Sequence, residues 1–448
     1  MEFLDKLVLP QSAEHIQLLH YMLMLVLFLF IPFISVVFGG TFLSYTFRKK
    51  FNKNGDKTFL RIAKDSIQLL TVNSYIGLIL GIIPLITIIL IFAQLLHTTT
   101  FPTVSDLALS FLLVSAGLIF IYVYRLSFAL KIVFDAVETK SADDFVKEEF
   151  TSYYSKTSKL SDNSVRLGMI LLFFGMWIFT GALTTAVYFD AWKSTSFFAT
   201  LFSAKVLINF LIWLCISFSL TGVTLLFLFL FWKKDELKVS EDYKDFVIGI
   251  SSRYALYFSL PMPVLVLLSI SLLPDSLLSG TMFAYSAIAI ILLFLSLNFV
   301  YLLYYKKQYN YVPYLFFTFL FTILSLIIKD QVTVNNATKY HSVVLSTEYE
   351  KILAELRGTG TEVQINAAEL YQVRCAACHK FDQKLVGPAH FDVLPKYVGK
   401  EAQLVAFIRN PVKVDPAYPP MPNPGLKPAE AEAVAKYLLE EYQKQKGK

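Results

Sequence analysis

The sequence predicts an all-α protein, in which eight transmembrane helices form a bundle and a small all-α domain follows it. Three observations support this prediction. The 448 residues are 56% hydrophobic and 17% charged, whereas soluble domains are about 25% charged. Several apolar segments exceed the roughly 20 residues that a helix needs to cross a bilayer. After residue 328 the chain becomes polar and then shows the apolar spacing of short amphipathic helices.

Eight apolar segments are long enough to span. They lie at 19–45, 72–96, 106–131, 166–189, 199–232, 254–273, 281–305 and 311–328. The first segment follows Glu2, Asp5 and Glu14 rather than a basic region, and no small-residue cleavage pattern comes after it. We therefore expect it to stay in the protein as a span and not to be removed as a signal peptide.

Lysine and arginine concentrate in every second connecting segment. Twenty-one of them lie in 46–71, 125–166, 233–253 and 306–307. The opposite segments, which are the N-terminus, 97–105, 190–198 and 274–280, hold only Lys6 and Lys193. Because cytoplasmic loops carry the positive excess, both termini should lie on the non-cytoplasmic side. These orienting residues account for the net charge of +6, so we predict no nucleic-acid partner.

The composition divides the chain into three parts. We expect a polytopic membrane domain over 1–329, a polar linker over 330–349 and an extracytoplasmic domain over 350–448. The last part contains three helical patterns, at 366–381, 400–410 and 427–445. The proline-rich stretch 411–425 between the last two cannot be helical, since proline removes a backbone donor and fixes φ.

Cys375, Cys378 and His379 form a Cys-x-x-Cys-His motif in the first of these helical patterns. This is the attachment sequence for haem c. Two cysteines three apart on a helical turn can reach the two vinyl groups, and the next histidine then faces the iron. A thioredoxin-like redox pair would expect a preceding strand and would not require the histidine. A zinc site would need two more ligands, and the tail offers only His390.

The second axial ligand of such a haem has two candidates. Met421 lies in the proline-rich stretch, which can hold a thioether rigidly toward iron, and Met/His ligation raises the reduction potential. His390 is the rival, but it follows His379 by only eleven residues. A methionine that serves only in packing would be expected on a helix face. We therefore predict Met421 as the ligand.

The tail resembles the class I c-type cytochromes, which have three to five helices around one haem. The similarity covers about residues 350–445 and includes AAELYQVRCAACH, the Val-Gly-Pro at 386–388, the loop with Met421 and the helix AVAKYLLEEY. It implies that Pro388 supplies a carbonyl to the other ring nitrogen of the proximal histidine. It also implies that Ala367, Tyr371 and Tyr437 are core residues.

The resemblance also implies a location, because haem c is attached on the exported side of the membrane. The tail should therefore lie in the periplasm, in agreement with the loop charges. We predict a multi-pass protein of the bacterial inner membrane with both termini on the periplasmic side.

The purpose of the eight spans is less evident from the sequence. His20 at the start of the first span and His97 at the end of the second lie at similar depth, which would permit a haem b between them on the outer side. The alternative is that both are interfacial histidines without a metal. Residues 15–44 resemble the first helix of the large subunit of bd-type quinol oxidases. The rest of that family's pattern is missing, so oxygen reduction does not follow.

These observations lead to three functional hypotheses. In the first, the protein is a membrane-integrated c-type cytochrome that transfers single electrons between a membrane respiratory complex and a periplasmic carrier. In the second, it is a quinol dehydrogenase or oxidase subunit with an additional haem b near His20 and His97. In the third, the spans are a structural assembly subunit of a respiratory complex. The sequence leaves open whether the chain is an electron-transfer protein only or part of an oxidoreductase.

Overall fold

The computed structural model describes residues 10–97, 99, 102–137, 143–187, 196–234, 237, 239–357 and 366–446. All regular elements in these residues are helical, which confirms the all-α prediction. The chain forms two compact units. The first consists of Met1–His20, Ala93–Thr99 and Thr338–Lys448, and the second of Tyr21–Phe92 and Thr100–Ala337.

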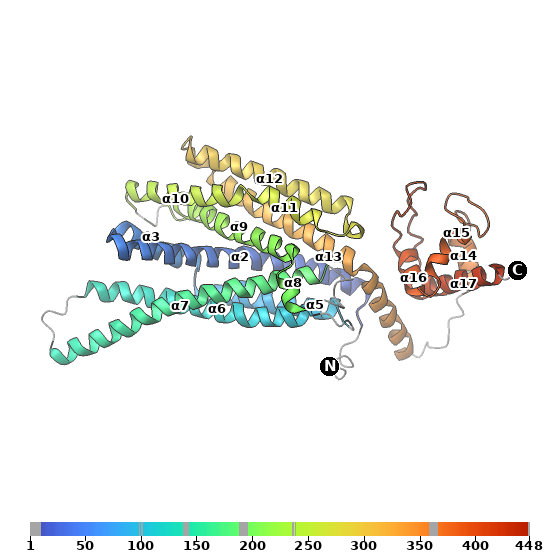
Figure 1. Cartoon of the computed structure of the whole chain (residues 1–448), viewed down its shortest axis with the longest axis horizontal. Coiled ribbons are helices and arrows are strands. Elements are labelled where there is room, and N and C mark those ends of the chain that lie inside the picture. Colours follow the sequence, from blue (N-terminus) through green and yellow to red (C-terminus); the bar gives the residue numbers. More distant parts are fainter. Residues whose placement is uncertain are drawn as a thin grey trace. The chain divides into compact units, whose positions relative to one another are not determined.

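Within the described residues, eight helices are long and apolar enough to cross a membrane, as predicted, and some of them consist of two or three consecutive elements. Figure 1 shows the long ones running along one another as a bundle. The elements before residue 260 are α2 (Ala13–Asn54), α3 (Lys57–Leu70), α4 (Ser74–Gly77), η1 (Leu78–Ile82), α5 (Ile83–Leu95), α6 (Thr103–Ala136), α7 (Asp144–Thr185), α8 (Phe197–Leu201), α9 (Ala204–Phe227), η3 (Leu228–Trp232) and α10 (Glu241–Ser259). They are followed by α11 (Met262–Ser271), η4 (Asp275–Leu277), α12 (Gly280–Tyr304), η5 (Tyr309–Tyr311) and α13 (Val312–Leu356).

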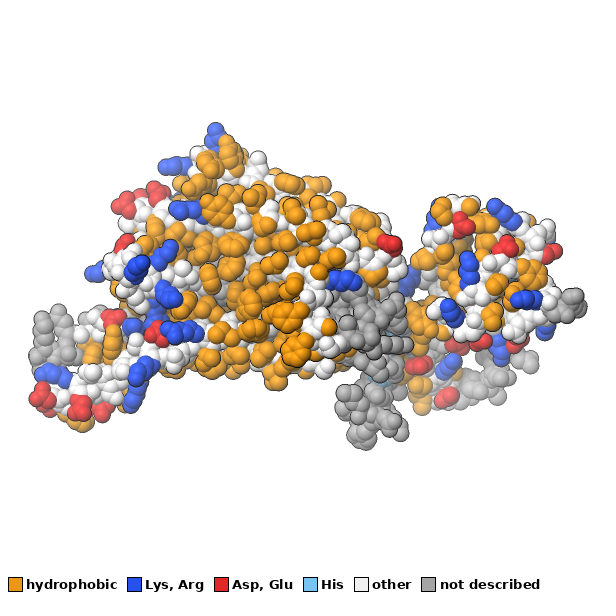
Figure 2. Space-filling view, in the orientation of Figure 1, with side chains coloured by type: hydrophobic (Ala, Val, Ile, Leu, Met, Phe, Trp, Pro, Cys, Tyr) orange, Lys and Arg blue, Asp and Glu red, His pale blue; other side chains and the backbone are white. Residues whose placement is uncertain are grey.

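The surface of the bundle separates apolar from charged side chains. On the face in Figure 2, hydrophobic side chains cover the middle of the bundle. Charged side chains gather at the end that holds α3, the last turns of α6 and the first turns of α7. An apolar belt with charges beyond it is the surface expected of a protein in a bilayer.

Close helix contacts in the second unit depend on small residues. The α9 and α10 helices pack along each other, and the Ser259 hydroxyl donates to the Ser219 hydroxyl at 3.1 Å. A Cβ added to Gly222 of α9 would meet the Ser251 carbonyl oxygen and lie 2.8 Å from the backbone nitrogen of Ala255, both on α10. Since backbone cannot move aside as a side chain can, glycine is required at this crossing.

The predicted linker is helical in the structure. The α13 helix continues without interruption from the last span to Leu356, so 330–349 lies inside it. No glycine or proline occurs from 314 to 357 that would end the helix. Where the membrane part ends and the tail begins functionally stays a prediction.

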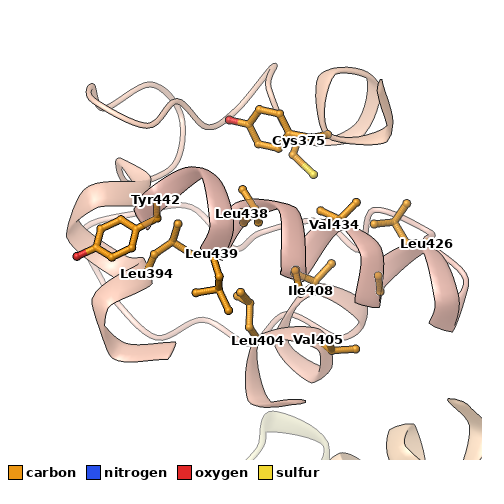
Figure 3. Close-up of a cluster of buried hydrophobic side chains, with 13 residues drawn as sticks. Cys375, Leu394, Leu404, Val405, Ile408, Leu426, Val434, Leu438, Leu439 and Tyr442 are labelled. Carbon is orange, nitrogen blue, oxygen red and sulfur yellow. The ribbon is translucent and has the colours of Figure 1, made fainter. Parts of the chain in front are cut away.

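The C-terminal residues form a small helical domain around one apolar cluster. Its elements are α14 (Ala367–Arg374), α15 (His390–Val393), η6 (Leu394–Tyr397), α16 (Glu401–Arg409) and α17 (Pro428–Lys446). The α14 and α17 helices pack together, and the rings of Tyr371 and Tyr437 lie 5.7 Å apart at their contact. Figure 3 shows side chains of α16 and α17, such as Leu404 and Leu439, in this cluster, to which Cys375 also belongs.

The Gly222 contact can be tested by two matched substitutions. Gly222→Ala should lower the stability of the detergent-solubilised protein by about 1–3 kcal/mol, because it overpacks the α9–α10 crossing. Gly249→Ala on α10 has its nearest neighbour at 3.6 Å, so it should raise stability by up to about 1 kcal/mol through helix propensity. Thermal unfolding followed by circular dichroism measures both, and equal shifts would contradict the packing assigned to Gly222.

Candidate functional site

The Cys-x-x-Cys-His motif forms a turn at the end of α14. The Cys375 amide donates to the Tyr371 carbonyl at 2.9 Å and ends the helix. The Cys378 and His379 amides then donate to the Cys375 carbonyl at 3.1 and 3.0 Å. The two cysteines and the histidine are therefore held on one turn, as the spacing predicts.

The two thiols differ from those of a redox pair. Cys375 is buried and Cys378 is half-buried, and both are free cysteines. Burial raises the pKa of the Cys375 thiol, and neighbouring Cys378 raises it further. Thioredoxin-like pairs instead need a thiol whose pKa is lowered, since the thiolate is the nucleophile. The surroundings of Cys375 thus argue against thiol–disulfide exchange.

The His379 imidazole is oriented by a backbone carbonyl. Its Nδ1 lies 3.1 Å from the carbonyl oxygen of Pro388. A carbonyl can only accept, so Nδ1 carries the proton in this hydrogen bond, and Nε2 is left with its lone pair for a metal. The Pro388 contact was expected from the family resemblance and is found in the structure.

The segment around Pro388 is tied to the motif by backbone hydrogen bonds. The Gly387 amide donates to the Cys378 carbonyl at 2.9 Å, and the His390 amide donates to the Lys380 carbonyl at 2.9 Å. A Cβ at Gly387 would collide with Cε1 of His379 and lie 2.7 Å from its Nδ1 and 2.8 Å from its Nε2. Only glycine allows the segment to lie this close to the imidazole.

Tyr371 supports the motif from α14. Its hydroxyl donates to the backbone carbonyl of His379 at 3.1 Å. Burial, followed by the effects of Cys375 and Tyr437, raises the pKa of Tyr371 to about 12, so the phenol stays protonated and can donate at neutral pH. The sequence predicted Tyr371 as a core residue but gave no sign of this hydrogen bond.

His390 packs beside His379. The centroids of the two rings are 5.2 Å apart, and the ring planes are 18° from parallel. The ring centroid of Phe381 lies 5.0 Å from that of His390. His390 is buried, and its Nε2 has no hydrogen-bond partner among the described residues. Burial, followed by the effect of His379, lowers the pKa of His390 to about 4, which keeps the ring neutral.

Met421 comes from a different part of the domain. It lies half-buried in the stretch between α16 and α17, which has no regular secondary structure, as the prolines predicted. Leu426, near the end of this stretch, belongs to the apolar cluster of the domain together with Leu404 and Ile408. The Met421 thioether and the His379 imidazole therefore come from two separate segments of the domain, and the role of Met421 as a ligand stays a prediction.

His20 and His97, the sequence candidates for a haem b, are both buried and both belong to the first compact unit. His97 accepts a hydrogen bond at its backbone carbonyl from Nε2 of His341 at 2.8 Å. His15 lies close by, with its Nε2 2.9 Å from the Gln94 side-chain oxygen. The sequence did not predict a role for His341, which lies in the expected linker.

The C-terminal domain is similar to known cytochromes. Residues 364–438 match the family model of cytochrome c oxidase, cbb3-type, subunit III. The cytochrome c-551 of Pseudomonas denitrificans is 40% identical over 76 residues, which are 92% of that protein and 16% of this chain. The cytochrome c-551 of Pseudomonas aeruginosa is 40% identical over 68 residues, which are 65% of that protein and 14% of this chain. The cytochrome c-551 of Azotobacter vinelandii is 36% identical over 75 residues, which are 92% of that protein and 16% of this chain.

The fold and the motif define a small cytochrome domain of the c type at the C-terminal end of a helical membrane protein. Through this domain the chain belongs to the c-type cytochrome family. A cytochrome c domain implies haem c, and its fusion to membrane-like helices indicates electron transfer. The site residues fit that cofactor, because the two thiols and an imidazole with Nε2 left over share one turn beside an apolar cluster.

The Gly387 contact predicts a specific defect. Gly387→Ala should force the His379 ring out of its place, because the added Cβ collides with it. We expect destabilisation of about 1–3 kcal/mol from overpacking. In a domain of this size each kcal/mol lowers the melting temperature by about 4–8 °C. The measurement is the temperature at which the haem absorption of the folded protein is lost. The exposed neighbour serves as control, and Val386→Ala should melt like the wild type.

Tyr371→Phe tests the second support of the motif. Removing the hydroxyl leaves the His379 carbonyl without this donor while the ring still fills the core. The expected cost is about 0.5–1.5 kcal/mol of stability, the usual worth of one hydrogen bond. Chemical denaturation followed by haem absorption measures this cost. An unchanged midpoint would show that the hydroxyl contributes nothing to the fold.

Proposed function

We propose that this protein is a membrane-integrated c-type cytochrome that transfers single electrons between a respiratory complex in the membrane and a periplasmic carrier. The observation that carries this proposal is the His379 imidazole, oriented by the Pro388 carbonyl with Nε2 left for a metal. It directly follows the cysteine pair in a domain that continues from membrane-spanning helices.

In this proposal each site residue has one role. Cys375 and Cys378 hold haem c through thioether bonds, and His379 is the proximal ligand. Met421 is the distal ligand, and Pro388 keeps the proximal imidazole in one tautomer and orientation. The haem iron supplies a reversible one-electron change. The apolar cluster excludes water from it, and solvent exposure is one of the factors that set the reduction potential.

The position of His390 supports Met421 as the distal ligand. The distal ligand would come from a residue that does not pack against the His379 ring. The His390 ring instead packs 5.2 Å from that of His379, three residues after Gly387, which touches the same imidazole. We therefore infer that His390 is a neighbour of the proximal ligand and that Met421 supplies the sulfur donor.

The family match suggests the kind of partner. The matching model is described as subunit III of a cbb3-type cytochrome c oxidase, and the relatives are cytochromes c-551. A membrane respiratory complex on one side and a soluble periplasmic carrier on the other fit such relatives. The loop charges support placing both termini in the periplasm of a bacterial inner-membrane protein.

A second candidate makes the membrane part catalytic. In this version the chain is a quinol dehydrogenase or oxidase subunit with a haem b near His20 and His97. The burial of both histidines within one compact unit favours it. The hydrogen bond between His97 and the neighbouring His341 is made by the backbone carbonyl of His97. A third candidate, a structural assembly subunit, would need the spans only to bind neighbouring subunits.

Met421→Ala tests the ligand assignment. The variant should keep covalent haem, because the cysteines are untouched, but lose the weak far-red absorption band of methionine-bound ferric haem. Its reduction potential should fall, since Met/His ligation raises it. Optical redox titration measures both properties. His390→Phe, the matched control, should keep the band, and the reverse pattern would exchange the two assignments.

Pyridine haemochrome analysis of the purified full chain separates the main proposal from its catalytic alternative. We expect one haem c and no haem b per chain, because the His379 imidazole is oriented by a ring hydrogen bond that leaves Nε2 for a metal. A second haem of the b type that is lost in His20→Ala and in His97→Ala would establish the alternative. Chains without any covalent haem would overturn both.

A further inference from the structure

A cavity of about 150 Å³ lies within the second compact unit, between α2, α7, α9 and α13. Most of its wall is apolar and buried. This part of the wall includes Leu27, Phe92, Phe179, Ile216 and Ile323. A cavity of this volume lined by such side chains is large enough for one benzene-sized ring.

The remaining wall is polar and comes from neighbouring turns of three helices. Thr184 and Asn209 face each other across α7 and α9, with the Asn209 amide 3.4 Å from the Thr184 hydroxyl. Lys205 and Lys329 also line the cavity. Lys329 is 5% exposed, and its ammonium pairs with the Asp330 carboxylate at 2.5 Å. Burying an ionisable group costs free energy unless it is paired, so the buried ammonium of Lys329 depends on this ion pair.

Trp213 provides an independent observation. It lines the cavity and is 95% buried, since only 5% of its surface is exposed. Its indole Nε1–H has no hydrogen-bond partner among the described residues. A buried donor without an acceptor costs free energy. The cavity therefore lacks one acceptor that a bound molecule would supply.

We propose that this cavity binds the head group of a membrane quinone or quinol. Such a head group is a flat ring with apolar faces and oxygen atoms at its edge, so it needs apolar walls and a few donors. The cavity offers this combination in Trp213, Asn209 and the two lysines. The inference rests on the proposed electron-transfer function, for which a quinol is the membrane-soluble class of electron donor.

The charge in the cavity distinguishes this ligand from a phospholipid. A phosphate head group needs uncompensated cations, whereas the ammonium of Lys329 already has the Asp330 carboxylate as its partner. Among the described lining residues, Trp213 offers a neutral indole donor without a hydrogen-bond partner, which suits a neutral quinone oxygen. A volume of about 150 Å³ also suits one ring better than a lipid head group with its glycerol.

The cavity lies at the ends of the helices that the loop charges predict to be periplasmic. Its wall includes the last turns of α7 and α11 and the first turns of α9. It also includes α13 up to Val334, after which the same helix leads toward the cytochrome domain. A quinol bound here would occupy the side of the membrane on which the haem domain is proposed to lie.

The test is photolabelling of the haem-loaded full chain in quinone-free phosphatidylcholine nanodiscs with an azido-benzoquinone that carries a short alkyl tail. We expect label in peptides from 205–216 and 323–334, and competition by decylubiquinone. Trp213→Phe keeps the aromatic volume and removes the donor, so labelling affinity should fall about five-fold. Trp232→Phe is the matched control, because Trp232 is 68% exposed and does not line the cavity.

The other outcomes decide against the proposal. No saturable labelling, or equal affinities for the two tryptophan variants, would overturn it. Phospholipid that co-purifies with the wild type and is lost from Asn209→Leu, with no competition by decylubiquinone, would assign the cavity to a lipid. Haem content and reduction by dithionite check the proposed cytochrome separately. A chain that holds redox-active haem c but binds no quinone would refute only this inference.

Discussion

The hydrogen bond between the His379 Nδ1 and the Pro388 carbonyl is the contact on which the site depends. It fixes the ring so that Nε2 is the atom left to bind a metal, and it requires the 387–390 segment to fold back on the motif. The Gly387 amide donates a hydrogen bond to the Cys378 carbonyl and holds this segment in place. The segment can lie this close to the His379 ring because Gly387 has no Cβ. The short 387–390 segment therefore orients the His379 imidazole of the Cys-x-x-Cys-His motif through contacts within the protein.

The membrane part depends on a different constraint, which is the satisfaction of backbone polar groups without water. The eight apolar helices meet it internally, and glycine or serine at crossings such as Gly222 lets them pack closely. The cavity that Trp213 and Lys329 line differs from these apolar contacts, because part of its wall is polar. Apolar packing would not require it, so we connect it to a ligand.

Sequence patterns predicted the features that depend on local order. These features are the turn of the Cys-x-x-Cys-His motif, the eight apolar helices and the non-helical stretch with prolines around Met421. Each depends on residues that are close together in the sequence. The contacts of Gly387 and His390 with His379 arise from a chain reversal, which spacing does not encode. The polar composition of 330–349 predicts a linker, but the segment contains no glycine or proline that would end the preceding helix, and it is helical in the structure. The cavity joins α2, α7, α9 and α13 and has no signature in any single segment.

The proposed function requires that haem c in the C-terminal domain exchange electrons on the periplasmic side of the membrane. The accessibility of the haem in oriented bacterial membrane vesicles tests this requirement. A membrane-impermeant one-electron reductant should reduce the haem within seconds in right-side-out vesicles, and in inside-out vesicles only after detergent is added. Immediate reduction in inside-out vesicles together with protection in right-side-out vesicles would contradict the account.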